Sequence, residues 1–164
     1  MAFWPLDRTR QNHGIEHGTV TVLLEQGVRP PIAGLATPWG FVIYAGVPVE
    51  KIQSAVAEAL GGLQEGNREL AVSPFCGTNL LVGFLIAGLA TALIMRKREG
   101  QLRRLLMVAG AIALSTVLRR PIGNELQRRF TTLADVDNVE IANVRCLWGA
   151  LHWVRTARTR GASL

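Results

Sequence analysis

Two long uncharged apolar segments in the middle of the chain constrain its fold more than any other feature. The first runs from Leu80 to Met95, and the uncharged residues 76–79 before it bring it to the length of a membrane span, which needs about 20 apolar residues. The second runs from Leu105 to Leu118, and basic residues follow each segment directly. The sequence therefore predicts a transmembrane helical hairpin over residues 76–120.

The second segment is short for a complete span. It could thin the bilayer around it, or enter and leave on one side. A buried helical hairpin in a soluble protein is the alternative. Basic residues stand at both ends of the second segment, where they would meet lipid headgroups, and this favours the membrane.

Composition agrees with a membrane location. Only 18% of the residues are charged, against about 25% in soluble domains, and the mean hydropathy is +0.24. The net charge of +6 would suit anionic lipid or nucleic acid. Because arginines flank the apolar segments and no nucleic-acid-binding motif is present, we expect the lipid bilayer as a partner and no nucleic acid.

The predicted location is the bacterial cytoplasmic (inner) membrane, with the chain crossing it more than once. The first residues contain no apolar signal-peptide region, and two spans return the chain to the side from which it started. We therefore expect the N-terminal domain in the cytoplasm. Basic residues on the two sides of the hairpin are nearly balanced, so charge counting alone leaves the orientation open.

Residues 1–75 predict a small α+β domain. Apolar spacing and capping residues predict a helix over residues 9–26, and Pro48 with Glu50 begins a second helix that extends to Gln64. Between them, residues 32–35 and 41–45 have strand composition around a turn. Such a hairpin is marginal alone and must pack on a helix, a partner or the bilayer surface.

Residues 121–164 predict a segment at the membrane surface, with an amphipathic helix that begins near Asn138. Trp148 and Trp153 fit a helix at the headgroup level, although packing in a core explains them equally well. The expected fold is thus an α-helical integral membrane protein with a small α+β N-terminal domain. Its order is helix, β-hairpin, helix, two-helix transmembrane hairpin and C-terminal amphipathic helix.

The motif that carries the most chemistry is His13-Gly14-Ile15-Glu16-His17, an H-x-x-E-H pattern. Residues four apart lie on one face of a helix, so His13 and His17 could bind one metal ion. Glu16 stands beside the second histidine, where it could act as the general base of a hydrolase. Zinc is the metal that such ligands favour. The alternative is a pair of surface histidines or a hydrogen-bonded polar cluster.

A catalytic zinc site needs a third protein ligand, and Cys76 is our preferred candidate. A thiolate is favoured at a helix N-terminus, and Pro74 and Gly77 suggest a turn that presents the sulfur. Equally, Cys76 could simply begin a membrane helix as a small apolar residue. Thr78 and Asn79 could orient a ligand or a substrate carbonyl, or only bond to the helix backbone. The remaining candidate ligands are Glu50, Glu58, Glu65 and Glu69.

Three patches together resemble the YqhQ-like proteins, a bacterial membrane family with predicted metal dependence, and their shorter relatives. They are residues 12–17, with the pattern N-H-G-I-E-H; residues 73–79, with the pattern S-P-F-C-G-T-N; and residues 120–141, from Arg-Pro-Ile-Gly to Val-Glu-Ile. The resemblance implies that His13, Glu16, His17 and Cys76 belong to one site. Ser73 stands where that family has a histidine, so a ligand or the catalytic activity itself could be lost here.

Two functions follow from these observations. The first is a membrane-bound, zinc-dependent hydrolase, peptidase-like, which acts near the membrane surface with zinc as its cofactor. The second is a non-catalytic accessory or structural subunit of a larger membrane complex, or of a homo-oligomer. The small size of the chain, its marginal hairpin and Ser73 favour the second.

Overall fold

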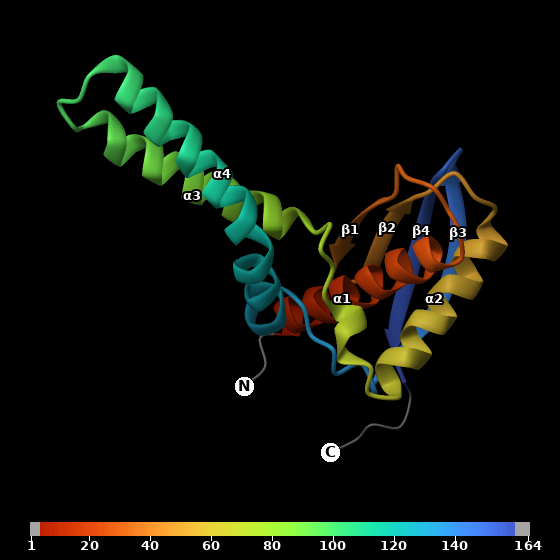
Figure 1. Cartoon of the computed structure of the whole chain (residues 1–164). Helices are drawn as coiled ribbons and strands as arrows, with labels where there is room; N and C mark the ends of the chain where they lie inside the picture. The colour runs from red at the N-terminus through yellow and green to blue at the C-terminus, as the bar shows by residue number, and fades with distance from the viewer. Residues whose placement is uncertain (1–3, 160–164) are drawn as a thin grey trace. The chain divides into compact units, whose positions relative to one another are not determined.

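The computed structural model describes residues 4–159, which divide into two compact units (Figure 1). The first unit, called the αβ unit here, contains residues 4–73 and 128–159. The second, the hairpin unit, contains Pro74–Gln127. The chain therefore leaves the αβ unit after Ser73, forms the hairpin unit and then returns to complete the αβ unit.

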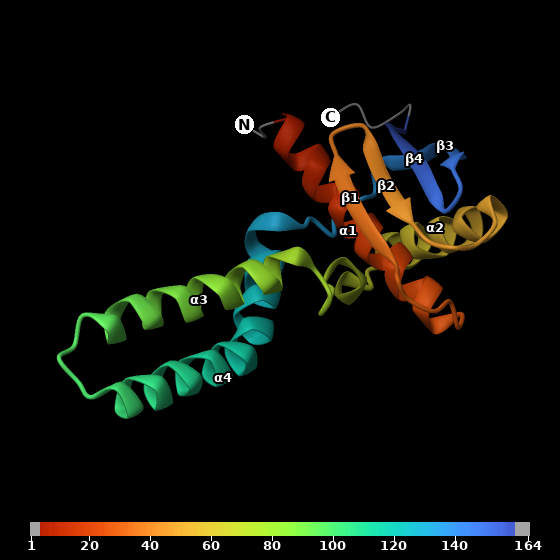
Figure 2. The same ribbon diagram turned by 90° about the horizontal axis from the view of Figure 1, so that it is seen from above.

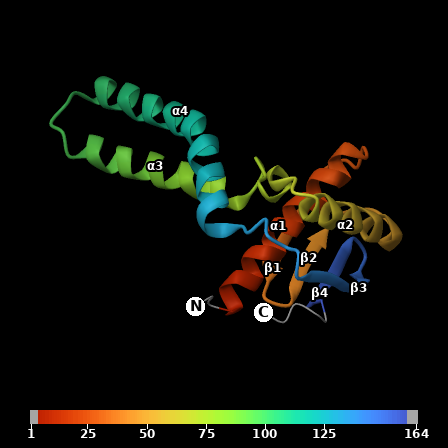
Figure 3. The same cartoon turned by 90° about the horizontal axis from the view of Figure 1, so that it is seen from below.

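The αβ unit packs two helices on one face of an antiparallel sheet. Helix α1 is Trp4–Glu25 and helix α2 is Val49–Gln64, and both lie across the same face in Figures 1 and 3. Helix α2, which the sequence predicts, buries Ile52, Val56 and Leu60, and these residues lie one turn apart on one face of the helix. A 3₁₀ turn, η1 (Arg68–Ala71), follows α2.

The sheet has four strands in the order β1-β2-β4-β3. Strands β1 (Ala33–Thr37) and β2 (Gly40–Tyr44) form the predicted hairpin, and β3 (Val139–Trp148) and β4 (Leu151–Arg158) form a second hairpin from the other end of the chain. Strand β4 pairs with β2, with Val154 opposite Phe41. The first hairpin therefore gains both the helical cover and the additional strands that it needs for stability.

The core of the αβ unit lies between the helices and the inner face of the sheet. Ile15 and Leu23 from α1, Phe41 and Ile43 from β2, and Val154 from β4 are fully buried there. Residues that alternate with these strand residues, among them Leu35 and Tyr44, lie on the opposite face and are exposed. The helices of this unit thus cover only one face of its sheet.

Helix α1 also buries an unusual number of polar side chains. Those below one-tenth exposed are Arg8, Gln11, Asn12, Glu16, His17 and Thr19. Many of these groups bond to the backbone of other elements. For example, Asn12 Nδ2 donates to Thr37 O at 2.7 Å, and Gln11 Nε2 donates to Asp135 O at 2.8 Å. Because burial of polar groups costs free energy that apolar residues would not cost, this helix is specialised for more than core packing.

The hairpin unit consists of α3 (Gly77–Met95) and α4 (Gln101–Leu126), which run antiparallel side by side (Figure 2). A π-helical turn, η2 (Gln127–Thr131), continues α4. Both helices are long and apolar enough to cross a membrane. Helix α4 begins before Leu105 and continues past Leu118 through Pro121, so the second apolar segment lies within a longer helix than predicted.

The prediction of a C-terminal amphipathic helix is wrong. Residues 139–158 form β3 and β4, joined by a turn at Gly149, which has a φ of 55°. The inner face of β4 carries His152, Val154 and Thr156, two of which are polar, so the alternation typical of a strand is hidden in the sequence. Residues 160–164, which also belong to the predicted segment, lie outside the described residues.

Candidate metal centre

Helix α1 brings His13 and His17 together in the αβ unit. The two residues are one helical turn apart, and their ring centroids lie 4.3 Å from each other. His17 is buried and His13 is partly exposed. The H-x-x-E-H spacing therefore places both imidazoles on one face of the helix, as the sequence predicts.

Main-chain carbonyl groups orient both imidazole rings. His13 Nδ1 lies 2.9 Å from Thr131 O, and His17 Nδ1 lies 2.9 Å from Ala71 O. A carbonyl oxygen only accepts hydrogen bonds, so in each neutral ring Nδ1 carries the proton and Nε2 keeps its lone pair. Histidine ligands of metals in proteins are generally oriented in this way, through a hydrogen bond from the other ring nitrogen.

Cys76 is the N-cap residue of α3, and its thiol is buried. The backbone N–H of Thr78 donates to Cys76 Sγ at 3.4 Å, and the Cys76 thiol donates to Thr78 Oγ1 at 3.4 Å. Donation from the Thr78 N–H and the positive end of the helix dipole both stabilise a thiolate over a thiol. The sulfur is thus in a setting that favours the form of cysteine that binds metal.

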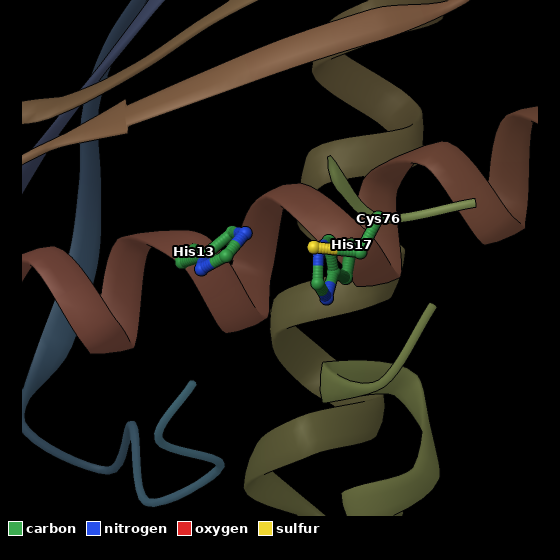
Figure 4. A group of neighbouring side chains, drawn as sticks. All are labelled: His13, His17 and Cys76. Carbon is green, nitrogen blue, oxygen red and sulfur yellow. The ribbon is translucent and has the colours of Figure 1, made fainter. Parts of the chain in front are cut away.

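The three predicted ligand side chains form one group (Figure 4). One ligand atom each from His13, His17 and Cys76 lies within 4.8 Å of the other two. Cys76 follows Ala71, whose carbonyl oxygen accepts from His17, by only five residues. Two imidazole nitrogens and a sulfur are donors of the kind that zinc prefers, and three protein ligands are typical of catalytic zinc sites.

Glu16 lies on the same helix, and its side chain packs against strand β1. A Cβ atom on Gly34 would overlap the carboxyl group of Glu16, so the carboxyl group occupies space that only a glycine leaves open. Glu16 is 6% exposed. Its carboxyl group is therefore held in the interior of the αβ unit, beside the turn of α1 that bears the two histidines.

The other predicted residues have different places. Asn79 Nδ2 donates to Pro74 O at 3.1 Å and to Asn124 Oδ1 at 3.2 Å, so its side chain ties the ends of α3 and α4 together inside the hairpin unit. Glu58 accepts from Gln26 at 2.8 Å, and Glu69 pairs with Arg128 at 2.7 Å. Glu50 and Glu65 are exposed. None of these four carboxylates belongs to the ligand group found among the described residues.

His152, the remaining histidine, belongs to the core rather than to a membrane surface. It is 1% exposed on the inner face of β4, and its Nε2 lies 3.3 Å from Ala45 O. Because residues 151–158 form a strand and not the predicted interfacial helix, His152 points into the core.

The backbone groups that orient the site could not be predicted from the sequence. Thr131 O and Ala71 O carry no signal in the sequence, since every residue has a carbonyl group. Gly34 could have been noticed as a glycine within a strand, a position that often marks the close approach of another group.

Comparison with known proteins identifies relatives of unknown function. The chain is 35% identical over 133 residues to an uncharacterized protein of the cyanobacterium Picosynechococcus sp. (strain ATCC 27264 / PCC 7002 / PR-6). The match covers 75% of this chain and 65% of that protein, so the chain spans about two thirds of the length of its relative. No solved structure matches the chain significantly.

The family model for the domain of unknown function DUF6391 matches residues 8–144. This range includes His13, His17, Cys76 and both helices of the hairpin unit. The match gives no support for the finer resemblance to YqhQ-like proteins or for the metal dependence that this resemblance implied. The chain belongs to the DUF6391 family.

Proposed function

We propose that this chain is a zinc-dependent hydrolase anchored in a membrane. In this proposal Nε2 of His13, Nε2 of His17 and the thiolate of Cys76 hold the ion, and Glu16 is the general base. The observation that carries the proposal is the shared orientation of the imidazoles. Nδ1 of each ring lies 2.9 Å from a main-chain carbonyl oxygen, as is common for histidines that bind a metal, and one ligand atom of each histidine lies within 4.8 Å of the ligand atom of the buried Cys76.

The ligand set fits a reactive site better than a purely structural one. Structural zinc sites use four protein ligands, whereas three leave one position for water or substrate. Zinc, when bound, would polarise a substrate carbonyl and lower the pKa of water. Glu16 would accept the proton of the attacking water and pass it to the leaving group. Its packing against Gly34 holds the carboxyl group in one place during this transfer.

The same proposal places α3 and α4 across the bilayer. Large apolar side chains on both helices are exposed: Phe84, Leu85 and Leu89 on α3, and Leu105 and Val117 on α4, are each 62–74% exposed. Such a surface is costly in water and favourable in lipid. The substrate would then be a peptide or a lipid-linked group close to the headgroups.

Metal content with matched variants tests the metal centre. We expect about one zinc ion per chain in the protein purified in detergent, and about none in the His13→Ala/His17→Ala variant. His152→Asn is the control, since it removes the histidine that lies outside the ligand group. Equal zinc in the wild type and in the double variant would overturn the proposal.

Hydrolysis is tested separately through Glu16. The Glu16→Gln variant should retain zinc but lose about 100-fold or more of any hydrolysis of peptide or phospholipid ester substrates, because the amide does not accept the proton. If the zinc-loaded wild type hydrolyses neither class of substrate, the hydrolase assignment fails while the metal centre stands.

A second candidate function is an accessory subunit of a membrane complex, favoured by the exposed face of the sheet. Leu35 is 69% exposed and Tyr44 is 44% exposed on the face opposite the helices, and Trp148 is 85% exposed at the end of β3. Mass photometry of the chain in native nanodiscs tests this function. A single chain with no co-purified protein would exclude it.

A further inference from the structure

The αβ unit contains a second place where charged groups gather, apart from the metal centre. A cavity of about 300 Å³ lies between the beginning of α1 and one end of the sheet. Its lining includes Arg8, Arg155, Arg158, Thr156 and Trp39. No Asp or Glu occurs among the described residues that line it, so the cavity combines three positive charges with no negative one.

Arg8 is the residue that makes this cavity unusual. It is 5% exposed, and its Nη2 donates to Thr156 Oγ1 at 3.2 Å. The Thr156 hydroxyl in turn donates to Asn12 Oδ1 at 2.7 Å. Arg8 Nη1 is buried without a hydrogen-bond partner, and no described carboxylate forms an ion pair with the guanidinium. Burial, together with the nearby charge of Arg158, lowers the pKa of Arg8.

A buried arginine with no counter-ion costs free energy, because the charge is taken from water and nothing compensates for it. The cost is removed when an anion enters the cavity beside it. Arg155 and Arg158 are exposed and form no ion pair with a carboxylate of the described residues, so both are available to the same anion.

A neighbouring hollow of about 300 Å³ extends this cavity across the open face of the sheet. It shares Trp39 and Arg155 with the cavity and adds Trp153, Arg145 and Asn143. In the register of β3 and β4, Arg145 pairs with Trp153 and Asn143 pairs with Arg155. The cationic end therefore continues into a surface of two indole rings and a further guanidinium, which suits the remaining part of a ligand.

We propose that this cavity binds the phosphate group of an anionic ligand. Guanidinium groups bind phosphate oxygens in a bidentate manner, and a phosphate monoester carries enough negative charge to compensate for several arginines at once. The phosphate could belong to a soluble phosphate ester or to the headgroup of an anionic phospholipid. The site is distinct from the metal centre, since the two share no residue.

Binding of two probes to the full-length protein tests the site. One probe is inorganic phosphate, followed by ³¹P NMR with the protein in detergent. The other is a vesicle of phosphatidylcholine with one-fifth phosphatidic acid, compared with phosphatidylcholine alone after reconstitution. We expect the Arg155→Gln/Arg158→Gln variant to lose about tenfold or more in affinity for the probe that binds, because two charge-assisted contacts are removed. Both arginines are exposed, so this variant should fold.

Two controls make the result specific. Arg29→Gln removes an exposed arginine of the αβ unit outside the cavity and should change affinity less than twofold. His13→Ala/His17→Ala should also bind phosphate normally, which separates this site from the proposed metal. Binding of inorganic phosphate identifies a soluble ester as the ligand class, and binding of phosphatidic acid alone identifies a headgroup. If neither probe binds, or if Arg29→Gln weakens binding as much as the double variant, the proposal is overturned.

Discussion

The residues of the candidate metal centre depend on backbone groups for their orientation. Thr131 O and Ala71 O hold the two imidazoles, and the N–H of Thr78 points to the sulfur of Cys76. A substitution at Thr131 or Ala71 would leave the carbonyl groups in place. The single substitutions that test the site are therefore those of the candidate ligands and of Gly34, which lies beside Glu16.

Cys76→Ser should lower the zinc content of the purified chain to less than about one-tenth of that of the wild type, because a hydroxyl group is a much poorer zinc ligand than a thiolate. Elemental analysis by mass spectrometry measures this content. Cys146→Ser is the matched control, since Cys146 is the other cysteine and is exposed. An equal loss in both variants, or in neither, would remove Cys76 from the site.

Gly34→Ala should destabilise the αβ unit by about 1–3 kcal/mol, because the new Cβ would overlap the carboxyl group of the buried Glu16. Thermal unfolding followed by circular dichroism measures the change. Gly46→Ala is the control, because a Cβ at Gly46 would meet no atom within 4 Å. A Gly34→Ala protein as stable as the control would show that Glu16 can move freely away from β1.

The two helices of the hairpin unit are joined by a cluster of polar side chains at one end. Asn79 on α3 is 3% exposed, and its amide donates to Asn124 Oδ1 on α4 and accepts from Gln127 Nε2 at 3.0 Å. In lipid, such interhelical hydrogen bonds contribute modestly, by about 0.6 kcal/mol on average. Gly123 allows α4 to approach Asn79 at this point.

Gly123→Ala should separate the two helices at their polar end, because the added Cβ would come too close to the backbone and side chain of Asn79. We expect a lower melting temperature in detergent than for the wild type. Gly110→Ala, also within α4, should be neutral or stabilising by up to about 1 kcal/mol, since its Cβ meets nothing and alanine favours helix. Equal melting temperatures for the two variants would contradict this packing.

At the scale of the whole molecule, the two units differ in how much of their apolar surface is exposed. The αβ unit has a buried core, whereas the hairpin unit exposes most of its large apolar side chains. Two helices of sufficient length and apolarity suggest an association with membranes, and the exposure of their side chains is what lipid contact requires.

Leu89→Arg should reduce the fraction of protein that remains in the membrane pellet after alkaline carbonate extraction. An arginine in the middle of a span costs about 2.5–3.5 kcal/mol for insertion. Leu35→Arg is the matched control, because Leu35 is as exposed as Leu89 but lies on β1 in the αβ unit. Complete release of the wild type by carbonate would contradict a spanning hairpin.

Much of the architecture could be predicted from local patterns. The apolar stripe of α2, the uncharged run of α3 and the strand composition of residues 40–44 each depend on neighbouring residues, and each predicted element is present. The strands β3 and β4 could not be predicted in this way, because β4 is stabilised by pairing with β2, which lies more than 100 residues earlier. Non-local pairing overrides the helical periodicity that the segment also allows.

The sequence by itself determined the two apolar helices and the spacing of His13 and His17 on one helical face, because a helix is a local structure whose periodicity the residues carry. Only the tertiary structure decided how the two rings are oriented, since the carbonyl groups beside their Nδ1 atoms come from residues 118 and 54 positions away. It likewise decided that Arg8 and Arg158, from opposite ends of the chain, share one cavity without a carboxylate. Close approaches between distant segments arise from packing as a whole, and no short stretch of sequence contains them.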